Sequence, residues 1–592
     1  MKTSKYIITG LLTIICSCTA ILAQDTILNR NVSVEREYRP VILDAGKVNS
    51  LPQILEPKAE KVPTAYSNFN LPLNADYNIH TLPAAGILAD KSIDKPGFAR
   101  IGFGTYLNSL VDASYLLINK PDMLLNAKLN HDGTLEAKRF HTTTKADVAF
   151  EKQFKNISLY AGLGGSHEYL KYYGDTYNLD NTEDFKLLAS LFPISTYNEV
   201  NRTDINSTGK PYSANDLKSQ PEGDTFWRMN ALVGFSSSQS QDIRYQAEVK
   251  YNLFSSINGL TENMIHTQAS YSSPSEKNRM GVDLELYNLF YNSATISPFN
   301  FWDSYSVLNL NPYYSMQHDQ WKVRIGVKTA FSFVHGDGFN PSADVTGEWN
   351  PIPKLLSVYG GVTGGYEINS QNKIFAGNPF LYSDLRVKDT YTPFNLYAGT
   401  KIKPVDNLMF NAFVDFRQVN NQYFFVNKEY KLENKNSSLS MPLPDSSLFS
   451  NRFNLVYSSA TLFRGGIRAT YNLPDIMNVE LKGTYNGWNV ATEEHAWNKP
   501  TFEAEMNANY KIDKSFSVSL NAFYEGGRFA KHGKKAVAMN DKADINVGLN
   551  YRYDKQFSAF AKINNLFNSQ YQDFYGYDVQ GINFMIGGAV SF

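Results

Sequence analysis

The last residues of the chain form the pattern that most restricts its fold. Between Gln580 and Phe592, apolar or small residues take every second position: Ile582, Phe584, Ile586, Gly588, Val590 and Phe592. The alternate positions are smaller and more polar, with Met585 as the exception. A period of two predicts a β-strand whose two faces meet different solvents. A closed membrane barrel explains why this strand runs to the final residue, because its last strand must pair with its first.

The same alternation recurs from Gly97 onward with few interruptions. Clear examples lie at 479–485, 502–512, 516–524 and 544–553. A water-soluble sandwich would need far fewer such strands and would place the apolar face in its core. Apolar side chains toward lipid and polar ones toward a wet lumen fit this pattern better. The pattern therefore predicts an all-β fold, with residues 97–592 forming a transmembrane antiparallel β-barrel.

The connections between these stretches alternate in length, as they do in outer-membrane barrels. Short turns rich in Pro, Asp, Asn and Ser are expected at 119–122, 153–156, 273–277, 317–320, 351–353, 404–407, 474–475, 513–514 and 554–555. Longer polar stretches are expected near 175–222, 293–303, 371–391, 428–450, 490–500, 531–540 and 569–580. Counting through them predicts about 22 strands, within a range of about 20 to 22.

Length and composition exclude several classes of protein. The chain has 592 residues, too many for one ordinary soluble domain. Its net charge of -1 gives no basic excess of the kind that binds nucleic acid. The mean hydropathy of -0.35 resembles that of a soluble protein, which alternating strands would also produce. Beyond the N-terminal segment, no apolar run approaches the ~18 residues that a membrane-spanning helix requires.

Residues 1–23 have the pattern of a secretory signal peptide. Lys2 and Lys5 precede a mostly apolar run, and small residues lead to a cleavage site near Ala23 and Gln24. Both cysteines, Cys16 and Cys18, lie in this segment, so the mature chain would have no thiol. Lipid attachment at Cys18 is the alternative.

Residues 24–96 differ from the rest of the chain. Prolines recur at Pro40, Pro52, Pro57, Pro63, Pro72, Pro83 and Pro96. Because proline removes a hydrogen-bond donor and restricts its predecessor, this segment should be mostly extended or irregular. The interpretations that remain are a disordered tail, or a functional segment that is either a periplasmic arm or a partial filling of the barrel lumen.

Several motifs resemble those of TonB-dependent receptors. The stretches 565–568, Tyr571, 575–577 and 580–587, together with Phe592, resemble the closing two strands of that family. Residues 377–381, Gly-Asn-Pro-Phe-Leu, resemble a further barrel motif, although Tyr-Ser-Asp follows where Pro-Glu often stands. The Tyr- and Asn-rich style is similar to that of Bacteroidetes outer-membrane proteins. The resemblance implies the outer membrane, uptake of a ligand, and TonB and the barrel-assembly machinery as partners besides membrane lipid.

The N-terminal segment departs from that family. The resemblance implies a folded plug that is considerably longer than Gln24 to Pro96, and the usual Arg-Gly patterns of a plug are missing there. A TonB-binding box could lie at Asp25 to Leu28 or at Asn31, Val32, Ser33, Val34 and Glu35, although such short pieces are common by chance. We therefore expect little energised transport by the barrel alone. Part of Tyr66 to Pro96 should lie in the periplasmic mouth, with Gln24 to Pro57 available to a periplasmic partner.

The terminal strand is also the candidate signal for barrel assembly. Its apolar face, Phe584, Ile586, Val590 and Phe592, ends on an aromatic carboxyl-terminal residue. We expect the assembly machinery to depend on Phe592 within this face.

Candidate catalytic groups are few, and no enzyme activity, cofactor or metal is expected. The nine histidines have no metal-ligand spacing, and Gly162 to Ser166 lies in a strand-like stretch rather than before a helix. The charged groups at 493–495 and 531–535 are interpreted as solvated loop residues. A helix is expected near 181–191. Trp302, Trp488 and Trp497 are interpreted as membrane-interface anchors, with stacking on a sugar or aromatic ligand as the alternative.

Three classes of function follow from these observations. An uptake barrel similar to the TonB-dependent receptors is favoured, because a simple porin needs fewer strands. A passive channel is one alternative. The other is a structural barrel whose N-terminal arm binds a periplasmic partner.

Overall fold

The computed structural model describes residues 95–174, 194–198, 202–204, 222–237, 242–257, 259–275, 278–293, 304–334, 338–382, 385, 387–432, 448–532 and 535–592. All of these belong to one compact unit, Asp76–Phe592. The expected signal peptide, the segment before residue 95 and the helix near 181–191 lie outside the described residues.

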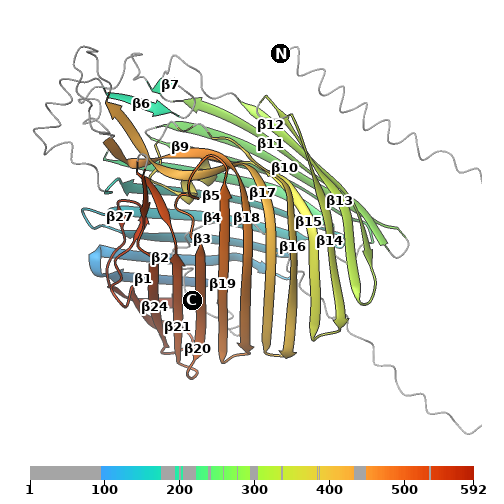
Figure 1. The fold of residues 1–592 in the computed structure, drawn as a ribbon. Coiled ribbons are helices and arrows are strands. Elements are labelled where there is room, and N and C mark those ends of the chain that lie inside the picture. Colours follow the sequence, from blue (N-terminus) through green and yellow to red (C-terminus); the bar gives the residue numbers. More distant parts are fainter. Residues whose placement is uncertain are drawn as a thin grey trace, which may run out of the picture. The chain divides into compact units, whose positions relative to one another are not determined.

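Twenty-two antiparallel strands form a closed barrel, which confirms the predicted fold class (Figure 1). In order around the wall they are β1 (Gly97–Gly104), β2 (Asn108–Lys120), β3 (Met123–Thr134), β4 (His141–Gln153), β5 (Ile157–Lys171), β8 (Gly223–Ser237), β9 (Arg244–Ser256), β10 (Leu260–Ser275), β11 (Asn278–Ser293), β12 (Tyr305–Gln317), β13 (Trp321–Phe333), β14 (Phe339–Ile352), β15 (Leu356–Glu367), β16 (Thr390–Val405), β17 (Leu408–Leu432), β18 (Leu448–Leu473), β19 (Met477–Val490), β20 (Phe502–Lys511), β21 (Phe516–Gly526), β24 (Lys542–Arg552), β25 (Phe557–Asn564) and β28 (Asn583–Ser591).

The first and last strands close the ring. β1 pairs with β28 from Phe98 opposite Ser591 to Gly104 opposite Met585. Beyond this ladder, the backbone N–H groups of Gly97 and Phe592 each donate to the other residue's carbonyl oxygen, at 2.8 and 2.9 Å. A side chain at position 97 would collide with the Phe592 ring, because a Cβ there would lie 2.5 Å from it. Pairing therefore continues to the last residue, and the barrel has no free edge at the closure.

The remaining elements lie in the connections. β6 (Ile194–Asn198) and β7 (Arg202–Asp204) form a hairpin, and β6 pairs with the far end of β17 (Figure 1, top). Two further hairpins are β22 (Phe529–His532) with β23 (Lys535–Ala538), and β26 (Gln572–Phe574) with β27 (Tyr577–Asp578). Among the described residues, the helical elements are η1 (Thr105–Leu107) and α4 (Gln371–Gly377). β17 and β18, with 25 and 26 residues, are the longest strands and continue past the ends of their neighbours.

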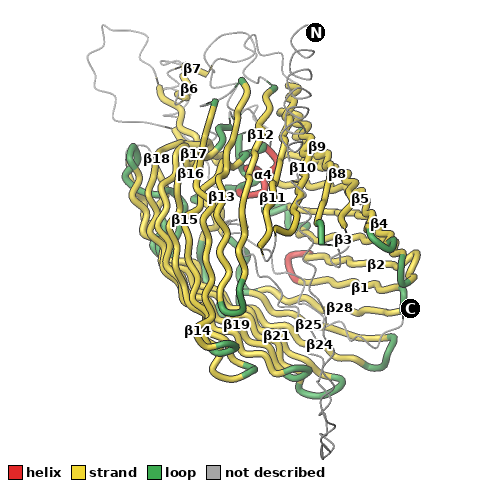
Figure 2. Tube along the Cα trace, turned by 90° about the vertical axis from the view of Figure 1, so that its right-hand side faces the viewer, coloured by secondary structure: helices red, strands yellow, loops and turns green. Residues whose placement is uncertain are grey.

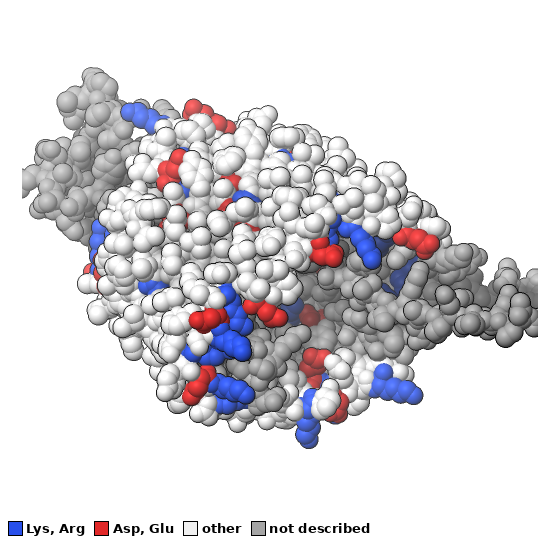
Figure 3. Space-filling view, turned by 90° about the horizontal axis from the view of Figure 1, so that it is seen from below, with Lys and Arg blue, Asp and Glu red and all other residues white. Residues whose placement is uncertain are grey.

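The outer wall is apolar along the strands, as the alternation predicts. Leu481, Tyr485, Phe502, Tyr510 and Leu549 are all exposed on it. No helix within the described ranges is long and apolar enough to cross a membrane. In Figure 3, which views the barrel from below, uncharged residues cover most of the wall. A closed barrel of this size with an apolar exterior is a barrel of the outer membrane, because its exposed apolar surface requires lipid.

The inner wall carries paired charges. Arg324 of β13 donates to Asp344 of β14 at 2.9 Å and, across β12, to Asp283 of β11 at 3.0 Å, so three strands share one ion-pair network. Asp415 accepts from Arg464 at 2.7 Å and from Arg417 at 3.1 Å. Such paired charges suit a wet lumen, since each of them keeps a partner without contacting lipid.

The two ends of the barrel differ as expected. At one end the strands join through short turns, including the predicted ones at 513–514 and 554–555. The Asp554 carboxylate accepts the backbone N–H groups of Gln556 and Phe557, both at 2.7 Å, and these bonds lower the pKa of that carboxyl. This is the periplasmic end, because long connections at the other end are typical of the extracellular side.

Candidate functional site

The connection between β15 and β16 carries a short helix, which lies near the extracellular ends of the strands, behind β11 and β12 in Figure 2. Its helix α4 begins where the Ser370 hydroxyl accepts the Lys373 N–H at 3.2 Å, and it ends before Pro379, which cannot continue the helix. Ile374 and Phe375 are fully buried on one side of α4. We call residues 369–382 the mouth segment.

One side of the mouth segment packs on strands β8, β9 and β10. The Phe375 ring lies 5.3 Å from the Phe226 ring and 5.2 Å from the Phe254 ring. The Gln371 and Asn372 N–H groups donate to the Glu262 carboxylate at 2.7 and 3.4 Å. These N–H groups open the helix and have no partner within it, so a carboxylate is favoured there.

The other side of the mouth segment pairs with β18. The Tyr382 N–H donates to the Phe453 carbonyl, and the Phe453 N–H donates to the Phe380 carbonyl, both at 2.9 Å. Leu381 and Phe453 form a parallel bridge. The strands β11 to β17 separate the two contact regions along the wall, so the segment spans an arc of the mouth.

Tyr577, in the β25–β28 connection, joins the mouth segment to the β5–β8 connection and to β18. Its fully buried ring stacks on Phe380 at 3.7 Å, and its edge meets the Tyr173 ring at 5.0 Å. Its hydroxyl donates to the Asn451 carbonyl at 2.5 Å, and burial raises its pKa well above the ordinary value. Segments from the β5–β8, β15–β16 and β25–β28 connections therefore converge with the start of β18 at one point.

These contacts belong to one apolar cluster, which we call the mouth cluster. Its buried members are Leu170, Tyr172, Phe226, Phe254, Ile374, Phe375, Leu381, Leu385, Phe425, Phe453, Leu455, Phe574 and Tyr577. A packed core above a charged lumen means that the described loops bury their apolar side chains against one another rather than extending into water.

The projecting hairpin of β17 and β18 has apolar neighbours on both faces. Phe425 and Phe453 belong to the mouth cluster, whereas Phe424 and Val456 pack against Trp497 in a second cluster. Side chains of a strand alternate between its faces, so one hairpin can serve both clusters.

The second cluster corrects two expectations about the loops. Trp497 is only 2% exposed and donates to Glu493 at 2.8 Å, and partly buried Trp488 packs on Phe424, so neither is a membrane-interface anchor. The Lys531 ammonium pairs with Glu493 at 2.7 Å, so these two charges link adjacent loops instead of being merely solvated. Trp302 and Lys534 lie outside the described residues.

Asp389 ties the two ends of the mouth connection together. Its carboxylate accepts the Asn369 N–H at 2.9 Å and the Tyr305 hydroxyl at 3.1 Å. The Asn369 amide also donates to Thr390 at 2.8 Å. Burial raises the pKa of Asp389 to about 6, despite these hydrogen bonds, which favour the charged form.

The predicted assembly residues all lie in or next to β28, far in sequence from the mouth segment. Phe584, Ile586 and Phe592 are exposed on the outer wall, and Val590 is half-buried. The Phe592 ring stacks on Tyr115 of β2 at 6.0 Å. Their role in assembly stays a prediction. The TonB-box candidate Asn31 to Glu35 lies outside the described residues.

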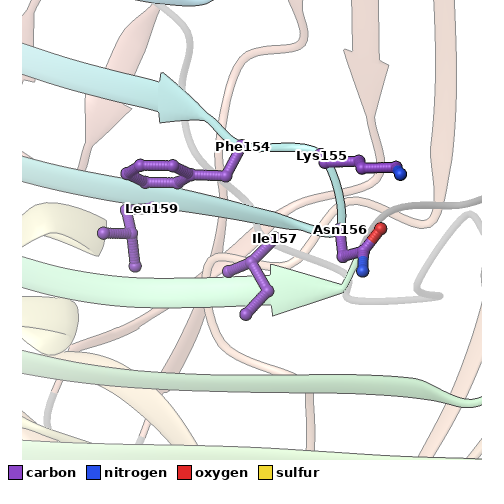
Figure 4. Close-up of a pocket in the computed structure, with 5 residues that line it drawn as sticks. All are labelled: Phe154, Lys155, Asn156, Ile157 and Leu159. Atoms are coloured by element: carbon purple, nitrogen blue, oxygen red, sulfur yellow. The ribbon is translucent and has the colours of Figure 1, made fainter.

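Other sequence features lie away from the mouth or carry no chemistry. Gly162 to Ser166 is part of β5, as expected for a strand. Within the described ranges, no three His, Cys, Asp or Glu residues are grouped to hold a metal ion. A shallow hollow of about 300 Å³ lies at the periplasmic β4–β5 turn, where Phe154, Ile157 and Leu159 form its apolar side (Figure 4). It contains no convergent polar groups of the kind a ligand site needs.

Sequence reasoning did not find the residues that hold the mouth segment. Glu262 and Asp389 stand in stretches without a motif, and Phe425 and Phe453 look like ordinary strand residues. The motif at 377–381 was the available signal, and it places Asn378 and Leu381 at fully buried positions.

The similarity of this chain to known proteins is found in its fold and not in its sequence. No protein-family model matches the sequence, and no curated protein matches it. The ferripyoverdine receptor of the Pseudomonas aeruginosa outer membrane matches with a TM-score of 0.56 at 11% identity, over 84% of this chain and 71% of that one. The ferric-catecholate import receptor Fiu from Escherichia coli K12 matches with a TM-score of 0.57 at 10% identity, over 84% and 82%.

A third structure widens the range of cargo among the matches. The copper transporter OprC matches with a TM-score of 0.55 at 14% identity, over 84% of this chain and 80% of that one. At such identities the likeness establishes a shared fold. The expected size and architecture of the barrel agree with it.

Proposed function

We propose that this chain is an outer-membrane receptor that takes up a ligand from outside the cell through its barrel. The proposal depends on the mouth cluster, in which three extracellular connections and the β17–β18 strands converge above a lumen lined with paired charges. A passive porin needs an open path, whereas a receptor must hold its path closed until a ligand arrives. The receptors and the transporter with the same fold support import as the activity.

The size of the barrel supports a gated path. Wall side chains cannot fill the lumen of a 22-stranded barrel, so an unfilled lumen would breach the permeability barrier. The mouth segment supplies part of the closure on the extracellular side. We propose that Tyr66 to Pro96 contributes on the periplasmic side, and that Asn31 to Glu35 is the place where a TonB-type partner would act.

The proposal predicts a barrel that is closed at rest. Purified, folded protein in a planar bilayer should show no stable openings, because its own segments obstruct the path. A bacterial strain that expresses the protein should also accumulate more of a scarce nutrient than a deletion strain. Cell-associated iron and copper, measured by mass spectrometry under metal limitation, are the first nutrients to compare, given the cargo named for the similar structures.

Two other results would decide against uptake. Steady ohmic conductance of the intact protein would indicate a passive channel. Equal iron and copper contents in the two strains, together with capture of a periplasmic protein by residues 24–96 used as bait, would favour a structural barrel with a binding arm.

A further inference from the structure

The mouth segment is closed by polar contacts at one end and by backbone pairing at the other. We propose that residues 369–382 form a movable lid over the extracellular mouth and that Glu262 of β10 is the positioning residue that latches it. This inference rests on the proposed passage through the barrel, because a lid matters only to a molecule that enters there.

The latch is a buried carboxylate. Glu262 is 2% exposed and accepts the Gln371 and Asn372 N–H groups at the start of α4. Arg228 adds a second polar contact, since its Nε–H donates to the Asn372 side chain at 2.9 Å. The same guanidinium pairs with Glu168 at 2.6 Å, so Arg228 is held by the wall and contacts the lid from there.

A carboxylate in this position favours a lid that can open. Apolar packing of Ile374 and Phe375 stabilises the closed arrangement. Glu262 adds to it, because its carboxylate accepts the two N–H groups that open α4, which would otherwise be buried without a partner. When the lid lifts, water can solvate Glu262 and the helix terminus. The open arrangement therefore leaves neither a buried charge nor a buried N–H group unpaired, which apolar packing alone would not provide.

The strands that carry the lid are irregular just below it. The β15–β16 ladder changes register between Thr363 and Gly365, opposite Pro393, which has no N–H to give to the ladder. The β16–β17 ladder changes register between Tyr391 and Phe394. Interrupted pairing on the supporting strands lets them bend without breaking the regular wall below.

Thiol labelling tests the lid directly, since no cysteine besides Cys16 and Cys18 occurs in the sequence. Ile374→Cys places a small thiol on the buried side of α4, and Glu494→Cys places one on an exposed loop residue. A membrane-impermeant maleimide is added to intact cells, and the labelling rate at 374 is divided by the rate at 494. The unsubstituted protein serves as the blank.

The expected result distinguishes the loss of the Glu262 latch from a general loosening of the lid. Glu262→Ala should raise the normalised rate at 374 by about tenfold or more, the factor expected when a hydrogen bond to a charged group is lost. Glu348→Ala is the matched control, because Glu348 is an inner-wall glutamate that accepts from Ser357 near the periplasmic turns. It should leave the rate at 374 unchanged.

Other outcomes overturn the proposal. A thiol at 374 that reacts as fast as one at 494 in the otherwise unchanged protein would mean that the segment is not closed. Unchanged protection in Glu262→Ala, or equal acceleration in Glu348→Ala, would mean that Glu262 is not the latch. If Glu262→Ala lacks the heat-modifiable mobility of a folded barrel, Glu262→Gln, which keeps the size of the side chain but loses its charge, answers the same question. Because labelling requires no transport, failed uptake would count against the proposed function and not against the lid.

Discussion

Phe592 is the residue with two separable tasks at the barrel closure. Its backbone completes the pairing with Gly97, and its exposed ring lies against Tyr115 on the outer wall. The backbone task can be performed by any residue, whereas the ring is specific to the position.

Deleting Phe592 should therefore lower the amount of folded barrel in outer-membrane fractions. The deletion removes two closing hydrogen bonds and the aromatic residue that we expect the assembly machinery to recognise. Heat-modifiable mobility on gels measures the folded fraction. Phe592→Ala retains the backbone bonds, so a loss as large as that of the deletion would assign the effect to the ring, and unchanged levels in both would remove the assembly role.

Asp389 gives closure of the lid a pH dependence. The charged and titratable groups around it are Tyr305, Tyr366 and Lys373, with Glu262 on the neighbouring side of α4. Its pKa is about 6 in the closed protein and would return toward the ordinary value of about 3.9 if lid opening exposed it to water. The closed form then binds the proton more tightly, so closure is stabilised as the pH falls through 6.

Normalised labelling of Ile374→Cys should accordingly be slower at low pH. Protonation of Asp389 in the closed form alone predicts a rate about tenfold lower at pH 5 than at pH 7.5. Asp389→Asn cannot take up this proton and should remove the part of the profile near pH 6, while Glu262, whose pKa burial raises to about 7, keeps its own part. A profile as steep in Asp389→Asn as in the parent would assign the pH dependence to another group.

The described extracellular connections pack against one another and do not extend as simple loops. Tyr577 joins three of them to β18, and Trp497 with Glu493 and Lys531 joins two more. The barrel ladder does not depend on either cluster, because every strand of the wall pairs with two neighbours. The extracellular layer can therefore loosen while the wall stays folded.

Tyr577→Ala tests this independence. Removal of a fully buried aromatic ring should destabilise the loop layer by about 3 to 5 kcal/mol, and Tyr577→Phe should cost about 1 kcal/mol for the lost hydroxyl bond. We expect faster proteolysis of the extracellular connections on intact cells in Tyr577→Ala, with unchanged heat-modifiable mobility. A simultaneous loss of both would show that wall and loops form one cooperative unit.

At the scale of the whole molecule, the question is how a wide lumen stays closed. The mouth segment covers one end, and the proposed contribution of Tyr66 to Pro96 concerns the other. Polar lumen walls would bind such an arm mainly through its extended backbone, and its prolines would limit the entropy lost on ordering.

Removal of Gln24 to Lys95 should then raise single-channel conductance in a planar bilayer and sensitise cells to large antibiotics. A truncated barrel that conducts no more than the intact one would leave the lid and its neighbouring loops as the occluding elements. Combining the truncation with Glu262→Ala distinguishes two closures in series from one. With two closures, the double variant should conduct more than either single variant.

The strands and turns of the barrel wall can be predicted from the amino-acid sequence alone. Alternation at 502–512 and 544–553 and turn chemistry at Asp513 and Asp554 are local, because side-chain direction and turn geometry depend on adjacent residues. These patterns predicted the strands, the apolar exterior, the alternation of short turns with longer connections and the closure at Phe592. The structure confirms these predictions. The size of the barrel followed from counting the strands, because each strand can be recognised from its own alternation.

The contacts that close the mouth become visible in the folded chain and not in the sequence. The Glu262 latch joins residues 109 positions apart, and Tyr577 reaches a carbonyl 126 positions away. Trp497 and Lys531 were assigned to interface and solvent because their partners come from other connections. No local period marks such contacts, since loop conformations are selected by whichever distant side chains they bury. The same limit explains why the sequence identified the barrel but not its lid.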